Sequence, residues 1–497
     1  MLLEQRIARY IKEEAEKLIK RYNLYHNVVH VEYVRNKKRL GDNCPNKDIK
    51  FPDYWQDNRK FNPFYVRKKY KAIAKSITKK IISREYKPNQ PYVRQVPKSD
   101  GTTRDVTIFQ IQDAAISKMY FDKLLTKNKH RFSSFSYAYR NDRNVHFAIQ
   151  DIFVDFQNHN RMFVAEFDFS KFFPSISHKF LKLQFDENGF NISDEEKFII
   201  NSFLAINTND NTGIPQGTSL SLFLANLSCW YIDKELEKLG VKFARYADDT
   251  LIWSSDYSKI NAACTIINNF SKTSGIKINV KKSAGVSLIT QTNLPSEIKK
   301  SNYIDFLGYS VTIENIKIKK ASLQKIKHQV SYLLYRNLIQ PFRKSLIINH
   351  NVSTKAAVAI AIMQIRRYLY GGLTDKHLKD YISGRIAKIY FKGIMSFYPL
   401  VNDEEQLKKL DGWMISTIFR TLKLHSKLVH NSDFSFVDIR NNSELLKFFR
   451  TQKINISDKE IDLQIPSFMR VYRAINRGIL DFGIEGIMNP RSLNYDY

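Results

Sequence analysis

The sequence predicts an α+β fold in which a small antiparallel sheet carries the candidate site. Two apolar, strand-like runs, residues 241–246 and 251–253, are separated by a tight polar corner, which is typical of a β-hairpin. A third strand pattern covers residues 162–168. After residue 316 the sequence is predominantly of helical type. A mixed fold with a helical C-terminal part is therefore expected.

The hairpin corner carries two adjacent carboxylates, Asp248 and Asp249. Adjacent carboxylates repel each other, and Mg²⁺ is a natural counter-charge because it favours one or two carboxylates together with substrate phosphates. A solvated Asp-Asp turn is the alternative for an isolated pair. The third strand favours the metal, because it ends near Asp168 and can place this carboxylate beside Asp248. Two such strand ends suit two-metal phosphoryl transfer.

Three motifs in one order make the sequence resemble the reverse transcriptases. Residues 246–249 match the Tyr-x-Asp-Asp box of that family, and Asp168 with the phenylalanines after it matches the first carboxylate motif. Residues 213–227 resemble the Pro-Gln-Gly segment and the helix that follows it. The resemblance covers residues 85–315. It implies a right-hand polymerase with fingers, an antiparallel palm sheet with helices, and a C-terminal α-helical thumb or helical-repeat domain.

The expected domain organisation follows from this resemblance. It comprises an N-terminal helical or irregular extension (1–62), fingers (63–160), a palm (161–315) and a thumb-like C-terminal domain (316–497). Within the extension, apolar residues at helical spacing predict an amphipathic helix over residues 2–22, followed by an irregular stretch. Residues 64–86 predict a very basic helix, whose charges form either a solvated face or a surface for phosphates.

The resemblance also implies a metal site and its chemistry. Two Mg²⁺ ions, with Mn²⁺ as an alternative, are expected on Asp168 and Asp248, with Asp249 in support and the Phe169 carbonyl as a further ligand. One ion would lower the pKa of the attacking hydroxyl and the other would stabilise the leaving pyrophosphate. Phe173 stands at the position of an aromatic steric gate, so deoxynucleotides and a DNA product are expected.

Further contacts are carried over by the same resemblance. The residues expected to bind the nucleotide are Lys98, Arg104, Phe173, Gln216, Gly217 and Lys282. Those expected to contact template or primer are Arg140, Tyr246, Phe306, Leu307 and Gly308. Lysine suits this role as a point charge and arginine as a planar fork for triphosphate oxygens. A plain surface lysine is the alternative for Lys282.

The net charge of +30 over 497 residues favours an acidic polymer as partner, although a lysine-rich coding bias can contribute. The expected partners are a structured non-coding RNA template, the DNA product and dNTPs, with a homo-oligomer as a further option. The three cysteines are scattered, which argues against disulfides and a Cys-based zinc site. Neither a signal peptide nor an apolar run of membrane-spanning length is found, so a cytoplasmic bacterial protein is expected.

Several functions remain open at this stage. The main hypothesis is an RNA-templated DNA polymerase of the defence-associated or abortive-infection type, because no endonuclease pattern follows the polymerase motifs and no retron pattern was found. Template-independent or protein-primed DNA synthesis, or a retron-like enzyme, is the alternative. Tyr495 and Tyr497 in the polar tail are the candidate protein primers, with an ordinary terminus as the simpler interpretation. An RNA-dependent RNA polymerase and an inactive RNA-binding scaffold are less favoured.

Overall fold

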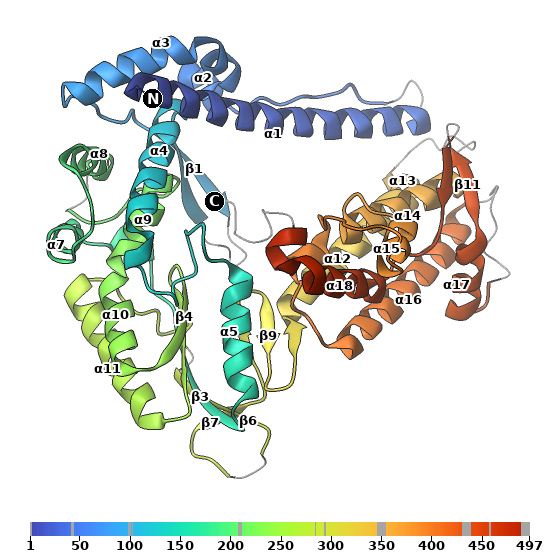
Figure 1. Ribbon diagram of the computed structural model, residues 1–497. Coiled ribbons are helices and arrows are strands. Elements are labelled where there is room, and N and C mark those ends of the chain that lie inside the picture. The colour runs from blue at the N-terminus through green and yellow to red at the C-terminus, as the bar shows by residue number, and fades with distance from the viewer. Residues whose placement is uncertain are drawn as a thin grey trace.

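The α+β prediction is confirmed by a computed structural model (Figure 1). The structure describes residues 2–40, 44–97, 101, 103–206, 211–283, 285–292, 295–344, 354–429, 439–456 and 459–488. Helices and a mixed sheet form the N-terminal two thirds, and a helical region follows after a small three-stranded sheet. Among the described residues, no helix combines the length and the apolar character needed to span a bilayer.

The N-terminal layer is more helical than the sequence predicts. Helix α1 (Leu3–Leu40) runs far past the expected end at residue 22, and it packs beside α3 (Pro63–Ile82) and α4 (Ile111–Asn128). Short helical turns, α2 (Tyr54–Asp57) and η2 (Arg59–Phe61), connect the two long helices. The far half of α1 was expected to be irregular because its sequence mixes polar and aromatic residues, and its apolar side chains Leu24, Val28 and Val31 are exposed rather than packed on a core. Its helical backbone nevertheless continues across the molecule.

The fingers contain a hairpin and the helix that supports it. Strands β1 (Tyr92–Pro97) and β2 (Thr103–Ile108) pair antiparallel, and α4 begins three residues after β2. A short η3 turn (Lys129–Arg131) and α5 (Val145–Gln157) lead from α4 to the palm. Asn144 caps α5 by accepting from two backbone amides of its first turn. α5 in turn leads directly to β3, the first strand of the palm sheet.

The palm sheet has the strand order β4-β5-β3-β6-β7. Its strands are β3 (Arg161–Phe167), β4 (Lys242–Tyr246), β5 (Asp249–Ser254), β6 (Gly285–Thr290) and β7 (Lys299–Ser301). All neighbours pair antiparallel except β6 and β7, which are parallel. The sheet is therefore antiparallel as expected, with one parallel strand at its edge.

Helices cover both faces of the palm sheet, because its strands alternate apolar side chains between the faces. On β3, Met162 and Val164 join the core under α5, whereas Phe163 and Ala165 join the core under α11. The helices on and around this second face are α6 (Phe172–Ser175), α7 (His178–Glu187), α8 (Asp194–Leu204), α9 (Ser219–Ser228), α10 (Trp230–Leu239) and α11 (Tyr257–Ser274). Cys229 separates α9 from α10.

A three-stranded sheet joins the palm to the C-terminal region. It consists of β8 (Ile304–Phe306), β9 (Tyr309–Val311) and β10 (Ile316–Ile318), in the order β10-β9-β8. The domain boundary expected at residue 315 falls inside this sheet, so a division after β10 follows the structure better. Helix α12 begins directly afterwards, at Lys320.

The C-terminal region is helical as expected, with one added hairpin. Its elements are α12 (Lys320–Leu334), η4 (Tyr335–Ile339), α13 (Gln340–Lys344), α14 (Thr354–Tyr370), α15 (Asp375–Ile382), η5 (Ile394–Phe397), α16 (Glu404–Leu428), α17 (Asn442–Thr451), β11 (Lys453–Ile456), β12 (Lys459–Asp462) and α18 (Phe468–Ile487). Arg336 of η4 forms an ion pair with Glu32, so α1 contacts this region.

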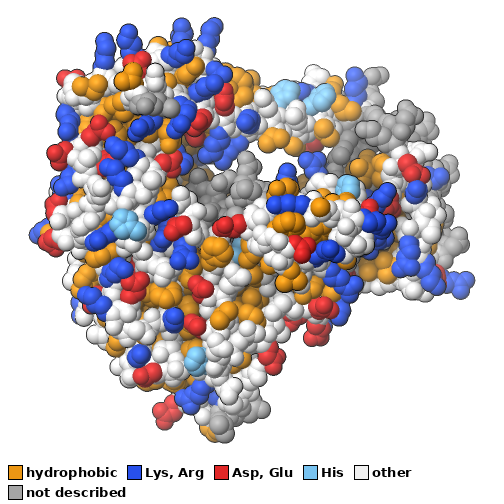
Figure 2. Space-filling model, viewed as in Figure 1, with side chains coloured by type: hydrophobic (Ala, Val, Ile, Leu, Met, Phe, Trp, Pro, Cys, Tyr) orange, Lys and Arg blue, Asp and Glu red, His pale blue; other side chains and the backbone are white. Residues whose placement is uncertain are grey.

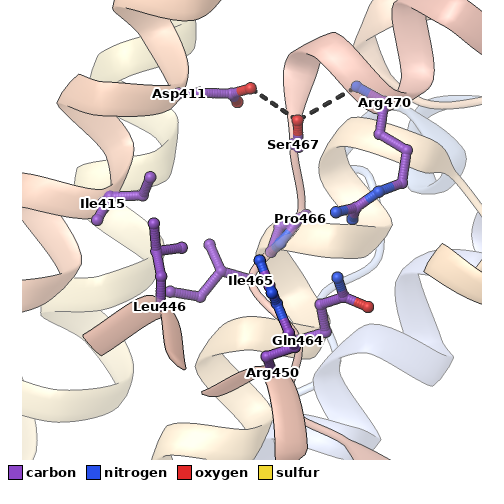
Figure 3. A pocket seen from close by; sticks show the side chains of 9 residues that line it. All are labelled: Asp411, Ile415, Leu446, Arg450, Gln464, Ile465, Pro466, Ser467 and Arg470. Carbon is purple, nitrogen blue, oxygen red and sulfur yellow. Dashed lines mark hydrogen bonds between the residues drawn. The ribbon is translucent and has the colours of Figure 1, made fainter. Parts of the chain in front are cut away.

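A cavity of about 190 Å³ lies where α16 and α17 meet the start of α18 (Figure 3). Asp411 points from α16 to the first turn of α18, where it accepts hydrogen bonds from the Ser467 hydroxyl and the Phe468 amide, both at 2.7 Å. Arg470 on the same turn forms an ion pair with the buried Asp375. These hydrogen bonds and this ion pair therefore connect the start of α18 to α16 and α15.

A buried ion pair ties the palm strand β4 to the surrounding helices. The guanidinium of Arg245, which is only 1% exposed, donates to both carboxylate oxygens of Asp233 on α10, at 2.7 and 2.6 Å. It also donates to Asn226 on α9 and to the Ser136 hydroxyl. Burial by itself would lower the pKa of Arg245, but the charge and hydrogen bonds of Asp233 together with the neighbouring Cys229 and Tyr139 outweigh this effect and raise it. The guanidinium of Arg245 thus connects four chain segments: β4, which carries it, α9, α10 and the loop of Ser136.

We expect Arg245→Met to lower the free energy of unfolding by about 3–5 kcal/mol, because it leaves the buried Asp233 carboxylate unpaired. Urea unfolding measures the effect. Lys242→Met on the exposed side of the same strand is the control, and its change should stay within about 0.5 kcal/mol. Adding Asp233→Leu to Arg245→Met should restore part of the loss, since no charge is then left alone. An Arg245→Met protein as stable as the parent chain would contradict the assignment.

Candidate active site

The end of β3 and the turn between β4 and β5 bring the three predicted carboxylates together. In the antiparallel pairing of β3 with β5, Phe167 lies opposite Thr250. Asp168 follows Phe167, and Asp249 precedes Thr250. Because the two strands run in opposite directions, Asp168 and Asp249 therefore lie side by side. Asp248 belongs to the two-residue turn directly before β5. The hairpin and the neighbouring strand end therefore have the arrangement that the sequence predicts.

The turn that carries Asp248 has a strained backbone, and a hydrogen bond from Arg245 stabilises it. Ala247 has a φ of 60°, in the left-handed region that costs a non-glycine residue about 1–2 kcal/mol. The carbonyl oxygen of Ala247 accepts a hydrogen bond of 3.2 Å from Arg245. Strained backbone of this kind persists where the surrounding structure determines it, and it gathers at functional sites. The buried arginine is thus a positioning residue for the turn.

Asp168 is fixed through its backbone. Its amide donates to the Ser283 hydroxyl at 3.3 Å, and its carbonyl accepts from the Asn279 amide at 2.7 Å. The next residue, Phe169, forms a β-bridge with Ile278, and its ring is buried. The ring of Phe169 therefore serves the core, and the expected role of its carbonyl as a metal ligand stays a prediction.

The electrostatics of the site show that the carboxylates influence one another. Desolvation is the main cause that raises the pKa of Asp249 to about 6, and the negative charges of Asp248 and Asp168 raise it further. Lys282 lies with its Nζ 2.8 Å from Oδ2 of Asp168, although its side chain remains 70% exposed. The hydrogen bond with Asp168 raises the pKa of Lys282. Lys319 also acts on Asp249 and lowers its pKa.

The donor set fits a metal site that is completed by substrate. Within the described parts of the chain, no three or more His, Cys, Asp or Glu side chains form a group that could hold a metal ion by themselves. However, Asp168, Asp248 and Asp249 supply hard oxygen donors whose mutual repulsion favours a cation. Mg²⁺ characteristically takes one or two carboxylates together with substrate phosphates rather than an all-protein cage. The arrangement agrees with that mode of binding.

The loop after α8 brings Gln216 and Gly217 to the fingers hairpin. Gly217 has a φ of +97°, and a Cβ at this position would overlap the backbone carbonyl oxygen of Thr107 on β2. Gly217 therefore allows the loop to approach the fingers hairpin closely, while the contact with the nucleotide that the resemblance implies for Gly217 stays a prediction. Phe173 lies nearby, half-buried on the core, and its carbonyl accepts from the Ile214 amide of the same loop at 2.9 Å.

Residues 306–309 form a hairpin turn, and the contact with template or primer that the resemblance implies for Phe306, Leu307 and Gly308 stays a prediction. Phe306 and Tyr309 pair across a two-residue turn in which Leu307 and Gly308 both have positive φ, of 46° and 85°. This geometry is that of a type I′ hairpin turn. The Gly308 carbonyl accepts from the amide of Lys319 at 3.0 Å, so the hairpin is connected to a charge that acts on Asp249. Phe306 is buried and contributes to the core.

Arg140 does not have the exposure that a template contact requires. Its residue is 6% exposed, and its guanidinium forms an ion pair with Asp142 and donates to the carbonyls of Ser133 and Lys129. The template contact expected for Arg140 is therefore replaced by a structural role inside its own loop. Tyr246 is likewise buried, and it belongs to the core beneath the turn of Ala247 and Asp248.

Some predicted residues lie outside what the structure describes. These are Lys98 and both candidate primers, Tyr495 and Tyr497. Arg104 lies on β2, and only its backbone is described. Conversely, sequence reasoning missed Arg245, Asp233 and Lys319. The signal for Arg245 was present, since an arginine in the middle of an apolar strand must find a buried partner.

The family described as "Reverse transcriptase (RNA-dependent DNA polymerase)" matches residues 96–311, which contain every motif of the site. Residues 96–311 form a reverse transcriptase domain. The domain is that of an RNA-directed DNA polymerase, a nucleotidyltransferase. The resemblance based on the three motifs is thereby confirmed at the level of the domain. Among proteins of curated function, none matches the chain.

Solved structures similar to the chain that contains this reverse transcriptase domain include telomerases of two yeasts. Telomerase from Candida albicans, in complex with a fragment of telomeric RNA, is 12% identical over 78% of this chain and 69% of that chain, with a TM-score of 0.37. Telomerase from Candida tropicalis, in complex with the corresponding fragment, is 12% identical over 77% and 68%, with the same TM-score. The apo telomerase of that organism is 13% identical over 72% and 71%, with a TM-score of 0.35.

We expect Gly217→Ala to reduce primer extension strongly, because the added Cβ displaces either the loop or the fingers hairpin of the reverse transcriptase domain. Primer extension and thermal unfolding are measured together. Gly275→Ala is the matched control, since Gly275 also has positive φ, at +78°, but a Cβ there meets nothing within 4 Å. The control should lose about 1–2 kcal/mol of stability and keep its activity. Equal activity losses in both variants would show that strain, not the close approach, is responsible.

Proposed function

We propose that this chain is an RNA-templated DNA polymerase. The primer hydroxyl and the nucleotide react at a site formed by Asp168, Asp248 and Asp249. The observation that carries the proposal is the convergence of these carboxylates at the ends of the interior strands β3 and β5 of the palm sheet, inside a reverse transcriptase domain. Desolvation and then the charges of Asp248 and Asp168 raise the pKa of Asp249, and the repulsion among the three carboxylates favours a bound cation. The chemistry is the attack of a primer hydroxyl on the α-phosphate of a nucleotide, with pyrophosphate as the leaving group.

Asp168 and Asp248 would hold two Mg²⁺ ions, or Mn²⁺, with Asp249 and the Phe169 carbonyl in support. Bound there, the ions supply a lowered pKa for the attacking hydroxyl and charge stabilisation for the leaving pyrophosphate. The protein's own contribution is position: Arg245 holds the turn, and the bonds from Ser283 and Asn279 hold the backbone of Asp168. Fixed donors in a partly desolvated site need little reorganisation during the reaction.

Four basic or polar residues are assigned to the nucleotide. Lys282 lies beside Asp168 with an exposed ammonium group, which suits a contact with the leaving pyrophosphate. Lys98 and Arg104 would neutralise the triphosphate from the fingers hairpin, as in the resemblance. Gln216 is half-exposed beside Gly217, where the loop meets β2, and would lie against the nascent base pair. Phe173 is the proposed steric gate against a ribose 2′-hydroxyl.

The primer end is proposed to lie along the hairpin of Phe306, Leu307 and Gly308, with Tyr246 supporting the catalytic turn from the core. The Gly308 carbonyl of this hairpin accepts a hydrogen bond from the Lys319 amide, and the positive charge of Lys319 lowers the pKa of Asp249. An RNA strand would be the template, since the domain is that of an RNA-directed polymerase.

The finer proposal is synthesis of cDNA from a dedicated non-coding RNA in antiviral defence. It is supported by the chain's resemblance to abortive-infection reverse transcriptases and by a long helical region in place of an endonuclease pattern. Sequencing of the nucleic acid that copurifies with the protein tests it. One recurrent RNA with its cDNA would support the proposal, whereas random cellular RNA would argue against a dedicated template. DNA that separates from protein in denaturant without protease would exclude priming by Tyr495 or Tyr497.

We expect Asp168→Asn and Asp248→Asn each to abolish Mg²⁺-dependent nucleotide incorporation while the protein stays folded. The amide keeps the size of the side chain and removes the charge that a divalent ion requires. Incorporation of dNTPs on an RNA template and circular dichroism are measured in parallel. The control is Asp256→Asn at the opposite end of β5, where asparagine caps α11 as well as aspartate does. Incorporation at the parent rate by either site variant would refute the metal assignment.

We expect Phe173→Ala to raise ribonucleotide incorporation relative to deoxyribonucleotide incorporation, because removal of the ring opens space for a 2′-hydroxyl. The ratio of kcat/KM values for the two sugars is the readout, so a general loss of activity does not disturb it. Phe172→Leu is the neighbouring control, since Phe172 is buried and packs on Phe169. A ratio unchanged in Phe173→Ala would show that Phe173 serves only the core.

A further inference from the structure

A group of aromatic rings lies exposed at the junction of α1, α2 and α3. Tyr22 is at its centre, with its ring centroid 5.5 Å from Phe51 in a stacked arrangement, 5.2 Å from Trp55 and 5.9 Å from Phe64. Tyr25 lies 6.1 Å from Tyr22. These five residues form the aromatic cluster. Phe51 is 58% exposed, Phe64 44% and Tyr25 38%, so the rings present apolar faces to solvent.

A stripe of lysines leads away from this cluster along α3. Phe64 starts the stripe, and Lys68, Lys71, Lys75 and Lys79 follow at spacings of four, three, four and four residues. Residues at such spacings share one helix face. These four lysines, the lysine stripe, are all exposed. The opposite face of α3 is buried through Val66, Ala74 and Ile77 among others, so the stripe points outward.

The charge of the lysine stripe is not neutralised within the protein. Between Arg59 and Ile82 the sequence has nine Lys or Arg residues and no Asp or Glu. Of these nine, only Arg67 forms an ion pair among the described residues, with Glu16 of α1. Figure 2 shows Lys and Arg side chains gathered along the upper edge of the molecule, over α1 and α3. A polyanion can therefore bind there without displacing an internal partner.

Exposed rings next to unpaired cations have the chemistry of a surface for single-stranded nucleic acid. Unpaired bases stack on aromatic side chains, while Lys and Arg contact the phosphates that connect them. A duplex satisfies only the second contact, because its bases are already stacked. The carboxylates of Asp53 and Asp57 flank α2, so the phosphates are expected on the α3 side of the cluster. Stacking and charge together distinguish a single strand from other acidic partners.

We propose that the aromatic cluster and the lysine stripe bind a single strand of RNA, outside the polymerase site. The proposal rests on the proposed function only in taking RNA as the polymer. Bases stack on Phe51, Phe64 and Tyr25, and the following phosphates lie along Lys68, Lys71 and Lys75. The surface holds template that has not yet been copied and is separate from the carboxylate site.

The first test uses the full-length protein with labelled single-stranded polyuridine RNA, titrated by fluorescence anisotropy over a series of salt concentrations. Combined Lys68→Gln, Lys71→Gln and Lys75→Gln should reduce the slope of log K against log salt by about 2, because each lost phosphate contact removes about 0.7 for a single strand.

The matched control for this test replaces three exposed lysines on the palm helices, Lys179, Lys182 and Lys272, which the proposal does not use. It changes the net charge by the same amount and should leave the slope unchanged. Equal changes in both triple variants would show a general charge effect and overturn the proposal.

The second test separates stacking from charge. Phe51→Leu with Phe64→Leu keeps apolar bulk but removes two stacking faces, so single-stranded RNA should bind at least about fivefold more weakly. Binding of a fully paired RNA duplex should not change. Unchanged single-strand affinity would overturn the proposal. If this variant instead altered the oligomeric state seen by sedimentation, with RNA affinity unchanged, the surface would be a docking site for a second copy, which also overturns it.

These measurements do not depend on the polymerase reaction. Loss of RNA binding in the lysine and leucine variants supports the surface even if the parent protein incorporates no nucleotide, in which case the proposed function fails alone. Full incorporation by the parent protein together with unchanged RNA binding in both variants would overturn the surface and leave the proposed function standing.

Discussion

The buried charge of Arg245 is the constraint on which the arrangement of the site depends. Moving a guanidinium out of water is costly unless every donor is satisfied, and Arg245 achieves this only when Asp233, Asn226 and the Ser136 hydroxyl all surround it. These partners come from two helices and a fingers loop. The remaining donor contacts the carbonyl of Ala247. The requirement for pairing therefore assembles the palm and sets the catalytic turn in one step.

This coupling explains how the protein tolerates an unfavourable arrangement at the site itself. Ala247 is strained, and desolvation together with the charges of Asp248 and Asp168 raises the pKa of Asp249. Neither feature would persist in an isolated hairpin. The apolar cores on both faces of the sheet hold the strands, and the Arg245 network holds the turn between them. Stability gained in the interior is thus used to keep charges close together where a cation and phosphates are proposed to bind.

The sequence predicted those parts of the structure that depend on local patterns. The strand ending at Asp168 and the turn at Asp248 were predictable, because alternating apolar residues and a polar corner define a hairpin. The burial of Arg140 was not, since its partners are mostly backbone carbonyls that leave no mark in a sequence. The full length of α1 was missed because its second half has no core to make it periodic. Lys319 was missed because only the tertiary fold brings it near Asp249.

The charge distribution also keeps two kinds of surface apart: the exposed lysines that can attract phosphates, and the carboxylates of the candidate site. Electrostatic interactions between exposed groups fade over about 8–10 Å at physiological salt, so distant surfaces act independently. The unpaired lysines of α3 can therefore attract phosphates without cancelling the negative charge of Asp168 and its neighbours. At the carboxylates, Lys282 and Lys319 already lie close and reduce the local repulsion. The net charge of +30 is consequently compatible with an acidic reaction centre, because the unpaired lysines of α3 and the carboxylates occupy separate surfaces. The template is proposed to lie on the first surface, and the growing end of the DNA product at the second.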